Sequence, residues 1–401
     1  MFQQRLLELD LEREKHILKI LLFSAMYPPI RTGTSFYSKN LADSLINLGH
    51  EVKIVTLKNK EVVHTENNQW ILRLNAFHFN LKKYFKHFRI SSLFPANYTR
   101  VARLVENFRP DSIILVNHYL DIAFLAIFAS KRCKKPLYVS VGTQLQSLSP
   151  VRNIILNKLD RLICGNMVFP HAHKIIAWDQ EILRYLNEVH RNRFEGKQVV
   201  IPFGVNGDPG LYESKRHNYE LKNQLLGVGG VIDHRNYVFQ VKVFNELIKV
   251  YPKLQFKIIG HVYDNRAQML VKELGIEERV VFMGEQPHEV VLEEMNNSDL
   301  HWMMLDGEYT GLGTANMEAM LLGVPVVSNI PKNLFGPDSL VEMKNFIQAD
   351  SKSIGNTLLK IVDVLKDKDK RESIGLNGKR FVVEKMNWHH VAAEIERLCC
   401  R

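Results

Sequence analysis

The chain has 401 residues, of which 46% are hydrophobic and 24% are charged, and its formal net charge is +10. This length suits two domains with separate cores, and no apolar run approaches the ~18–20 residues that a membrane-spanning helix needs. The four cysteines form no CxxC pair, and no nucleic-acid-binding motif accompanies the positive charge, so we expect no metal site, no disulfide framework and no nucleic-acid partner. A cytoplasmic protein is expected, whose charge suits a phosphorylated ligand or anionic lipid.

The first 57 residues predict a helix followed by a βαβ unit. Residues 1–17 mix leucines with charged residues, which predicts a short amphipathic surface helix, with a membrane contact as the alternative. Leu18–Phe23 and Val52–Leu57 are apolar runs typical of buried parallel strands. Between them, Gly33 ends a loop and Phe36, Leu41, Leu45 and Leu48 recur at helical spacing. Doubly wound sheets bind ligands at such a first turn.

Residues 70–109 combine basic and aromatic side chains with a single acid, Glu106. This composition suits an interfacial helix on anionic lipid, and the alternative is a solvated basic face whose aromatics pack inward. The residues expected to face a membrane or a second substrate are Lys82, Lys83, Lys86 and Arg89.

Three further strands are expected in the first half, at 111–117, 136–141 and 171–177. His118 follows the first of them, at the sheet edge where ligands bind, and is a candidate catalytic residue, although a structural role is the alternative. Gln144 follows the second and can hydrogen-bond a hydroxyl but cannot act as an acid or base at neutral pH.

After a polar stretch at 207–223, the second half repeats the α/β alternation. Strands are expected at 224–228, 254–260, 279–285 and 300–305, with a helix at 238–250. The tail, 351–401, reads as helical and polar.

The stretch Leu305–Val327, LDGEYTGLGTANMEAMLLGVPVV, predicts an anion site. Gly311 and Gly313 permit a sharp turn and a close backbone approach before a helix from Thr314, which Gly323 caps. Free N–H groups at the start of that helix suit a diphosphate. Glu318 lies about one turn into the helix, where its carboxylate can accept hydrogen bonds from sugar or ribose hydroxyls.

This stretch resembles the donor site of family 4 glycosyltransferases, a retaining group with two Rossmann-like domains facing a cleft, the GT-B architecture. The family motif, Glu-x7-Glu followed by EAM…G-PVV, matches at Glu318 and in the run through Val327. Gly33 falls on the second glycine of the family's N-terminal pair, and VVIPFGVN, residues 199–206, resembles the IPNGVD segment that begins the interdomain linker. NWHHVAAEIERL resembles the terminal helix that crosses back onto the first domain.

The resemblance implies transfer of a sugar, with retained configuration, from a nucleotide-sugar donor to a hydroxyl of a glycan or lipid-linked acceptor, in surface polysaccharide or glycolipid synthesis. It implies no metal or other cofactor, and a location at the inner face of the membrane or free in the cytoplasm. Three parts are implied: an acceptor domain at 1–203, a donor domain at 204–384 and a terminal helix at 385–401.

The resemblance also assigns site residues. Arg235 falls at the family's diphosphate-binding lysine, with His234 as a second donor, and Phe282, Met283 and Gly284 lie where the nucleobase is held. The donor-contacting set is completed by a group of small residues and one acid: Gly33, Thr310, Gly311, Gly313, Thr314, Ala315 and Glu318. Arg235, Glu318 and His118 are the catalytic candidates.

Three positions depart from the family pattern, and each lacks a charged or titratable group. Gly230 stands at the usual arginine, Thr310 at the first glutamate and Val141 at the usual histidine. A degenerate GT-B protein acting as a binding or regulatory subunit is therefore an alternative, and a nucleotide-sugar epimerase is a third.

Overall fold

The computed structural model describes residues 17–30, 32–58, 70–78, 89–146, 149–205, 217–306, 311–337 and 339–400. Apart from Ile17, the helix predicted at 1–17 lies outside these residues. Lys82, Lys83, Lys86 and Thr310 also lie outside them.

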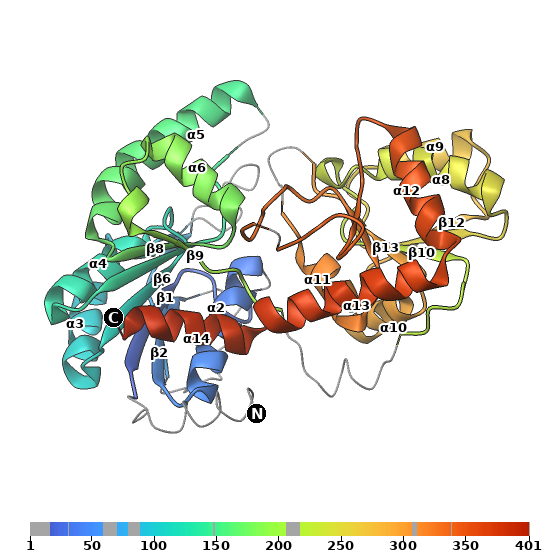
Figure 1. Cartoon of the computed structure of the whole chain (residues 1–401). Coiled ribbons are helices and arrows are strands. Elements are labelled where there is room, and N and C mark those ends of the chain that lie inside the picture. Colours follow the sequence, from blue (N-terminus) through green and yellow to red (C-terminus); the bar gives the residue numbers. More distant parts are fainter. Residues whose placement is uncertain are drawn as a thin grey trace, which may run out of the picture.

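The N-terminal domain is built on a seven-stranded parallel sheet in the order β3-β2-β1-β6-β7-β8-β9. β6 and β7 are buried at every residue, as expected for strands covered by helices on both faces. The strands are β1 (Lys19–Ser24), β2 (Glu51–Leu57), β3 (Ile71–Leu74), β6 (Ser112–Val116), β7 (Leu137–Val141), β8 (Lys174–Ala177) and β9 (Gln198–Val200). The helices are α2 (Gly33–Asn47), α3 (Pro95–Phe108), α4 (Ile122–Cys133), α5 (Pro150–Ile163) and α6 (Gln180–His190) (Figure 1). Two short strands, β4 (Phe77–His78) and β5 (Arg89–Ile90), pair antiparallel outside the main sheet.

The C-terminal domain has a six-stranded parallel sheet in the order β12-β11-β10-β13-β14-β15. Its strands are β10 (Gln224–Val228), β11 (Gln255–Ile259), β12 (Val280–Gly284), β13 (Leu300–Trp302), β14 (Val326–Ser328) and β15 (Ile347–Gln348). Its helices are α8 (Tyr237–Val250), α9 (Arg266–Glu273), α10 (His288–Asn296), α11 (Thr314–Leu322), α12 (Ile354–Leu365) and α13 (Lys368–Lys385). In both sheets the first strand lies inside and the order reverses beside it, which is the point where doubly wound sheets bind ligands.

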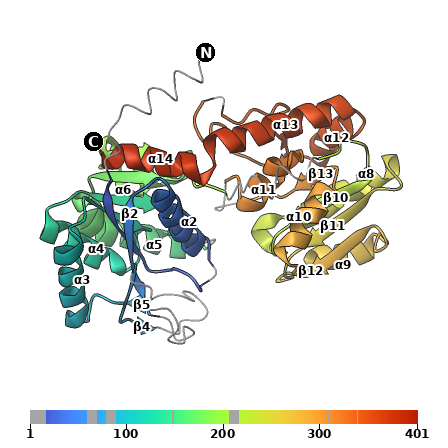
Figure 2. The same cartoon turned by 90° about the horizontal axis from the view of Figure 1, so that it is seen from below.

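The chain crosses between the domains twice, side by side. The backbone N–H of Val205 donates to the carbonyl of Met386 at 2.8 Å, and Gly204 lies so close to Trp388 that a Cβ would meet its ring at 2.6 Å. α13 is continued by α14 (Trp388–Cys399), and Figure 2 shows α14 lying against the N-terminal domain. There Trp388 packs edge-on against Tyr37, and the Tyr138 hydroxyl donates to the Leu398 carbonyl. The predicted fold, including the helix that crosses back, is confirmed.

Two local predictions were wrong. Phe36 is 59% exposed, because the buried stripe of α2 passes through Tyr37, four residues before Leu41, and Tyr37 is only 2% exposed. The strand expected from residue 171 begins at Lys174, because a short 3-10 turn, Phe169–His171, precedes it. Within the described ranges, no helix has the length and apolarity to cross a bilayer.

Candidate active site

The loops that follow β10 and β13 meet at the side chain of Met303. The Arg235 guanidinium, on a 3-10 turn at Asp233–Arg235, places Nη1 at 2.7 Å from Met303 Sδ and 3.1 Å from the Val228 carbonyl. On the other side, the methyl of Met303 fills the space beside Gly313. The structure thus brings Arg235 to the glycine loop, although 78 residues separate Arg235 from Gly313 in the chain. None of the described residues accepts a hydrogen bond from Arg235 Nε or Nη2.

Glycine is required where these loops approach each other. Gly313, the residue before α11, has φ +76°, and a Cβ there would overlap Met303. Gly229 has φ +128°, and a Cβ there would overlap the Arg235 guanidinium. Because left-handed backbone and close contact coincide at both positions, a larger residue at either would push Met303 or Arg235 out of place.

Asparagines hold the beginning of the glycine loop. Asn236 Nδ2 donates to Asp306 at 2.5 Å, and the Asn329 side chain bonds both to Asp306 and to the backbone of Leu305. The backbone N–H of Asp306 donates to the carbonyl of His234 at 2.7 Å. Partial burial, with the Arg235 charge beside it, lowers the pKa of His234, so its imidazole is neutral at pH 7. The loop is therefore fixed as far as Asp306, and residues 307–310 lie outside the described ranges.

Glu318 points from α11 toward the segment predicted to hold a nucleobase. Its Oε1 lies 3.1 Å from Nε2 of His288, the first residue of α10, which follows β12 and Gly284. This hydrogen bond raises the pKa of His288. Gly284 has φ +68°, and its carbonyl accepts from the Gly260 N–H at 2.8 Å, while the Met283 carbonyl accepts from Gln286 at 2.7 Å. The base, ribose and phosphate regions predicted from the sequence thus follow one another along the edge of a single sheet.

On the N-terminal domain, Gly33 begins α2 and has open space beside it. Its neighbour Thr32 caps the helix by accepting from the Ser35 N–H at 3.2 Å. Asn117, at the end of β6, donates to Thr34 and accepts from the Gly142 N–H, which ties three loops of this sheet edge together. Gly33 is therefore at a helix N-terminus with free N–H groups, as an anion site requires.

Asp179 was missed by sequence reasoning. It caps α6 by accepting from the Ile182 N–H at 2.8 Å, while its other oxygen faces the glycine loop, 3.9 Å from where a Cβ on Gly311 would stand. The next residue, Gln180, donates its N–H to the carbonyl of Leu334 in the C-terminal domain at 2.9 Å. Burial raises the pKa of Asp179 to about 6. In the sequence it resembles any helix cap, since only the fold brings it to Gly311.

His118 lies in a buried cluster. Its side chain is inaccessible, and Nε2 is 3.3 Å from Asp160 of α5, a carboxylate that also accepts from the Tyr185 hydroxyl at 2.5 Å. Burial alone would raise the pKa of Asp160. The charge of His118 and the hydrogen bonds from His118, His190 and Tyr185 together hold the pKa of Asp160 well below its usual range. This position favours the structural alternative for His118. With Cys164, His118 and Asp160 bring three potential metal-ligand atoms within 4.8 Å of one another, and burial raises the pKa of the Cys164 thiol.

Two further candidates, Arg89 and Gln144, and two of the positions that depart from the family pattern lie in the following surroundings. Arg89 is buried in β5 rather than displayed on a basic surface. Gln144 donates to the Glu181 carbonyl at 3.4 Å, near the start of α6. Val141 is fully buried in the N-terminal core, and Gly230 lies against the ring of Tyr263.

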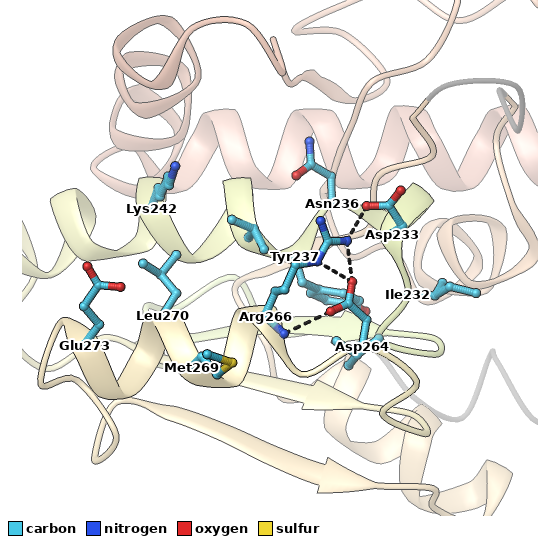
Figure 3. Close-up of a pocket in the computed structure, with 13 residues that line it drawn as sticks. Ile232, Asp233, Asn236, Tyr237, Lys242, Asp264, Arg266, Met269, Leu270 and Glu273 are labelled. Atoms are coloured by element: carbon cyan, nitrogen blue, oxygen red, sulfur yellow. Dashed lines mark hydrogen bonds and ion pairs between the residues drawn. The ribbon is translucent and has the colours of Figure 1, made fainter. Parts of the chain in front are cut away.

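A groove of ≈ 420 Å³ lies between α8 and α9, beside the loop that carries Arg235 (Figure 3). At its rim Arg266 bonds to both Asp264 and Asp233, so it links the loops that follow β10 and β11. The groove includes neither Gly313 nor Glu318. It is therefore separate from the predicted donor-contacting residues, and the ion pair of Arg266 with Asp233 braces the turn before α8.

Two doubly wound parallel domains, joined by a double crossover and a returning C-terminal helix, define a GT-B protein. Residues 31–208 match the model of glycosyltransferase family 4, and residues 212–397 match that of the glycosyl transferases group 1. Together the two models cover most of the chain, which belongs to the family 4 glycosyltransferases of GT-B architecture.

Two proteins similar in sequence and one similar in fold are compared with the chain. α-Monoglucosyldiacylglycerol synthase of Acholeplasma laidlawii is 24% identical over 61% of this chain and 63% of its own. The capsular polysaccharide biosynthesis glycosyltransferase CapM of Staphylococcus aureus is 24% identical over 69% of this chain and 73% of its own. Anabaena Alr3699/HepE, solved with UDP and glucose, superposes with a TM-score of 0.66 at 16% identity, covering 96% of this chain and 99% of that one.

Proposed function

We propose that this protein is a retaining glycosyltransferase that moves a sugar from a nucleotide-sugar donor to a hydroxyl of a glycan or lipid-linked acceptor. The observation that carries the proposal is that Arg235 and Gly313, the residue before α11, both lie against the side chain of Met303. A cation and a set of helix N-terminal N–H groups at one sheet edge suit a diphosphate, whose negative charge both would stabilise.

The leaving diphosphate gains charge as the glycosidic bond breaks, so these groups act where charge develops. The planar Arg235 guanidinium can bind two phosphate oxygens at once through Nε and Nη2. Glu318 would accept hydrogen bonds from the ribose, since it lies between the glycine loop and the end of β12. Gly33 and Asp179 would contribute from the acceptor domain. In this proposal a donor phosphate oxygen takes the acceptor proton, and no step needs a metal ion.

Surface polysaccharide or glycolipid synthesis, at the cytoplasmic face of a membrane, is the setting we propose. One similar protein is named for a glucosyldiacylglycerol and another for capsular polysaccharide. The net charge of +10 agrees with an anionic surface or a phosphorylated substrate.

Donor binding is tested by thermal unfolding with UDP, GDP, ADP and their common sugar derivatives. A ligand at ~100 times its Kd stabilises the folded protein by about 2.7 kcal/mol, which corresponds to several degrees for domains of this size. We expect such a shift with one nucleotide for the wild type, and its loss in Arg235→Ala.

Arg380→Ala is the matched control, because Arg380 is exposed on α13 and should leave the shift unchanged. If no nucleotide shifts the wild type, the donor site fails and the alternative of a degenerate binding subunit replaces it. If Arg235→Ala keeps the full shift, the role of Arg235 is refuted while donor binding stands.

We expect the ionisation of Asp179 to appear in the pH dependence of kcat/KM as a rise near pH 6. A carboxylate that orients the acceptor hydroxyl by accepting its hydrogen bond works only when ionised, so wild-type kcat/KM should rise as the pH passes through about 6. Asp179→Asn still caps α6, because asparagine caps as well as aspartate. We expect this variant to be slower and to lack the rise. The test is to measure kcat/KM of the wild type and of Asp179→Asn from pH 5 to 8. If the variant has the same rates and the same pH dependence as the wild type, Asp179 serves only to cap α6.

A further inference from the structure

Helix α5 turns its apolar side chains outward. Along its outer side lie six exposed hydrophobic residues, which we call the α5 apolar face: Val151, Ile154, Ile155, Leu159, Leu162 and Ile163. Each is between 41% and 68% exposed, and Met167 in the following turn is 50% exposed. The spacing is that of one helical stripe. Figure 1 shows α5 at the outer edge of the N-terminal domain, beside α6.

The inner side of α5 is polar, which explains why the helix sits this way round. Asp160 is the residue of α5 that is buried, and it is held by Tyr185 and His118 as described above. Arg161 Nε also donates to the carbonyl of Val189 at the end of α6. Specific polar bonds therefore attach the helix, and its apolar residues take no part in the core. A surface helix in a globular protein usually has the reverse arrangement.

The accessible charges on α5 are all positive. Arg152 and Lys158 are exposed and Arg161 is half-buried, while the only acid of the helix, Asp160, is inaccessible. Beyond the helix, Arg193 bonds to Gly165 and Asn166 and extends this charge. With 14 residues, α5 is about 21 Å long, so the apolar face and its cations form one continuous strip.

We infer that the α5 apolar face docks on an anionic lipid bilayer, with α5 parallel to its surface. An exposed apolar stripe with cations along it, on a helix too polar to span a membrane, is an arrangement that inserts into the headgroup boundary. The cations select anionic over neutral lipid. A protein partner would match the apolar area but would not require positive charge throughout. The inference deepens the membrane association in the proposed function and does not depend on the donor site.

The test is sedimentation of the full chain with vesicles of phosphatidylcholine, with or without 30 mol% phosphatidylglycerol as probe lipids. The variants are Ile155→Asp and Leu162→Asp, and the control is Leu359→Asp, at a residue 70% exposed on α12. We expect the wild type and the control to bind the anionic vesicles and to bind neutral vesicles much less. Each α5 variant should lose at least about tenfold in partitioning, since one apolar side chain accounts for a factor of this size.

Light scattering and the nucleotide-induced thermal shift complete the experiment. Variants that keep the wild-type thermal shift are folded, so lost vesicle binding then reports the surface. Vesicle binding unchanged in both variants would overturn the inference. So would a wild-type dimer that the variants convert to monomers without any change in vesicle binding, because a second copy would then occupy the face. Absence of a nucleotide shift in the wild type would count against the donor site and leave the vesicle result valid.

Discussion

Arg235→Ala is expected to lower kcat/KM by about 10²–10³, the loss typical for removing one group that stabilises developing charge. Arg235 is held by Met303 and the Val228 carbonyl through Nη1, so its other N–H groups can meet a phosphate without reorganisation. Lysine would keep the positive charge but cannot form the two parallel hydrogen bonds of a guanidinium. The kcat/KM of Arg235→Lys should therefore lie between those of the wild type and Arg235→Ala. The rate of nucleoside diphosphate release at low donor concentration measures the effect.

Arg380→Ala provides the comparison on the same domain, and its kcat/KM should equal that of the wild type. If Arg235→Ala also keeps wild-type kcat/KM, charge stabilisation must come from other groups, and the assignment of Arg235 to the diphosphate is refuted. A raised KM with unchanged kcat would instead assign it to uniform donor binding.

Gly375→Ala should destabilise the C-terminal domain, although alanine favours a helix over glycine by about 1 kcal/mol. At Gly375, α13 crosses the end of α11, and a Cβ would overlap the backbone carbonyl oxygen of Gly323 and lie 2.9 Å from the Tyr219 hydroxyl. That hydroxyl already donates to the same carbonyl at 2.9 Å. A backbone atom cannot yield as a flexible side chain can, so we expect a net loss of about 2–4 kcal/mol.

Gly355→Ala is a matched control, because Gly355 lies in α12 with no atom within 4 Å of a built Cβ. There only the helix propensity changes, and the melting temperature should stay constant or rise slightly. Differential scanning calorimetry measures the melting temperatures of the two variants, and that of Gly375→Ala should be clearly lower. Equal melting temperatures would show that α11 and α13 are not in the close contact described.

The fold was predictable because its signals are local. Apolar runs such as Leu18–Phe23 mark strands buried on both faces, and Gly323 and Pro325 mark the end of α11 in the sequence itself. The returning helix was predictable only through the resemblance carried by NWHHVAAEIERL, since periodicity does not say which domain a helix contacts. The burial of Phe36 was predicted wrongly because Phe36 and Tyr37 are both aromatic, and helical spacing alone does not say which of two adjacent apolar residues lies on the buried side of α2.

The site was predictable only in part. Gly311, Gly313 and Glu318 are close in the chain, so spacing placed them on one loop and helix. Asp179 comes from the other domain, and nothing at residue 179 distinguishes it from an ordinary cap. His118 shows the opposite case: the end of a strand suggests a ligand-facing residue, while the partner that buries it, Asp160, is 42 residues away. The α5 apolar face escaped attention because an amphipathic pattern does not reveal which side faces inward.

The most direct test of glycosyl transfer is the release of nucleoside diphosphate from a panel of UDP-, GDP- and ADP-sugars, with and without a lipid extract that supplies acceptors. We predict release from one donor class, acceleration by the extract, and a radiolabelled sugar appearing in the lipid or glycan fraction with the donor's anomeric configuration. Tight binding of a nucleotide sugar with no release and no labelled product from any donor would contradict the account and identify a binding protein that uses a glycosyltransferase fold.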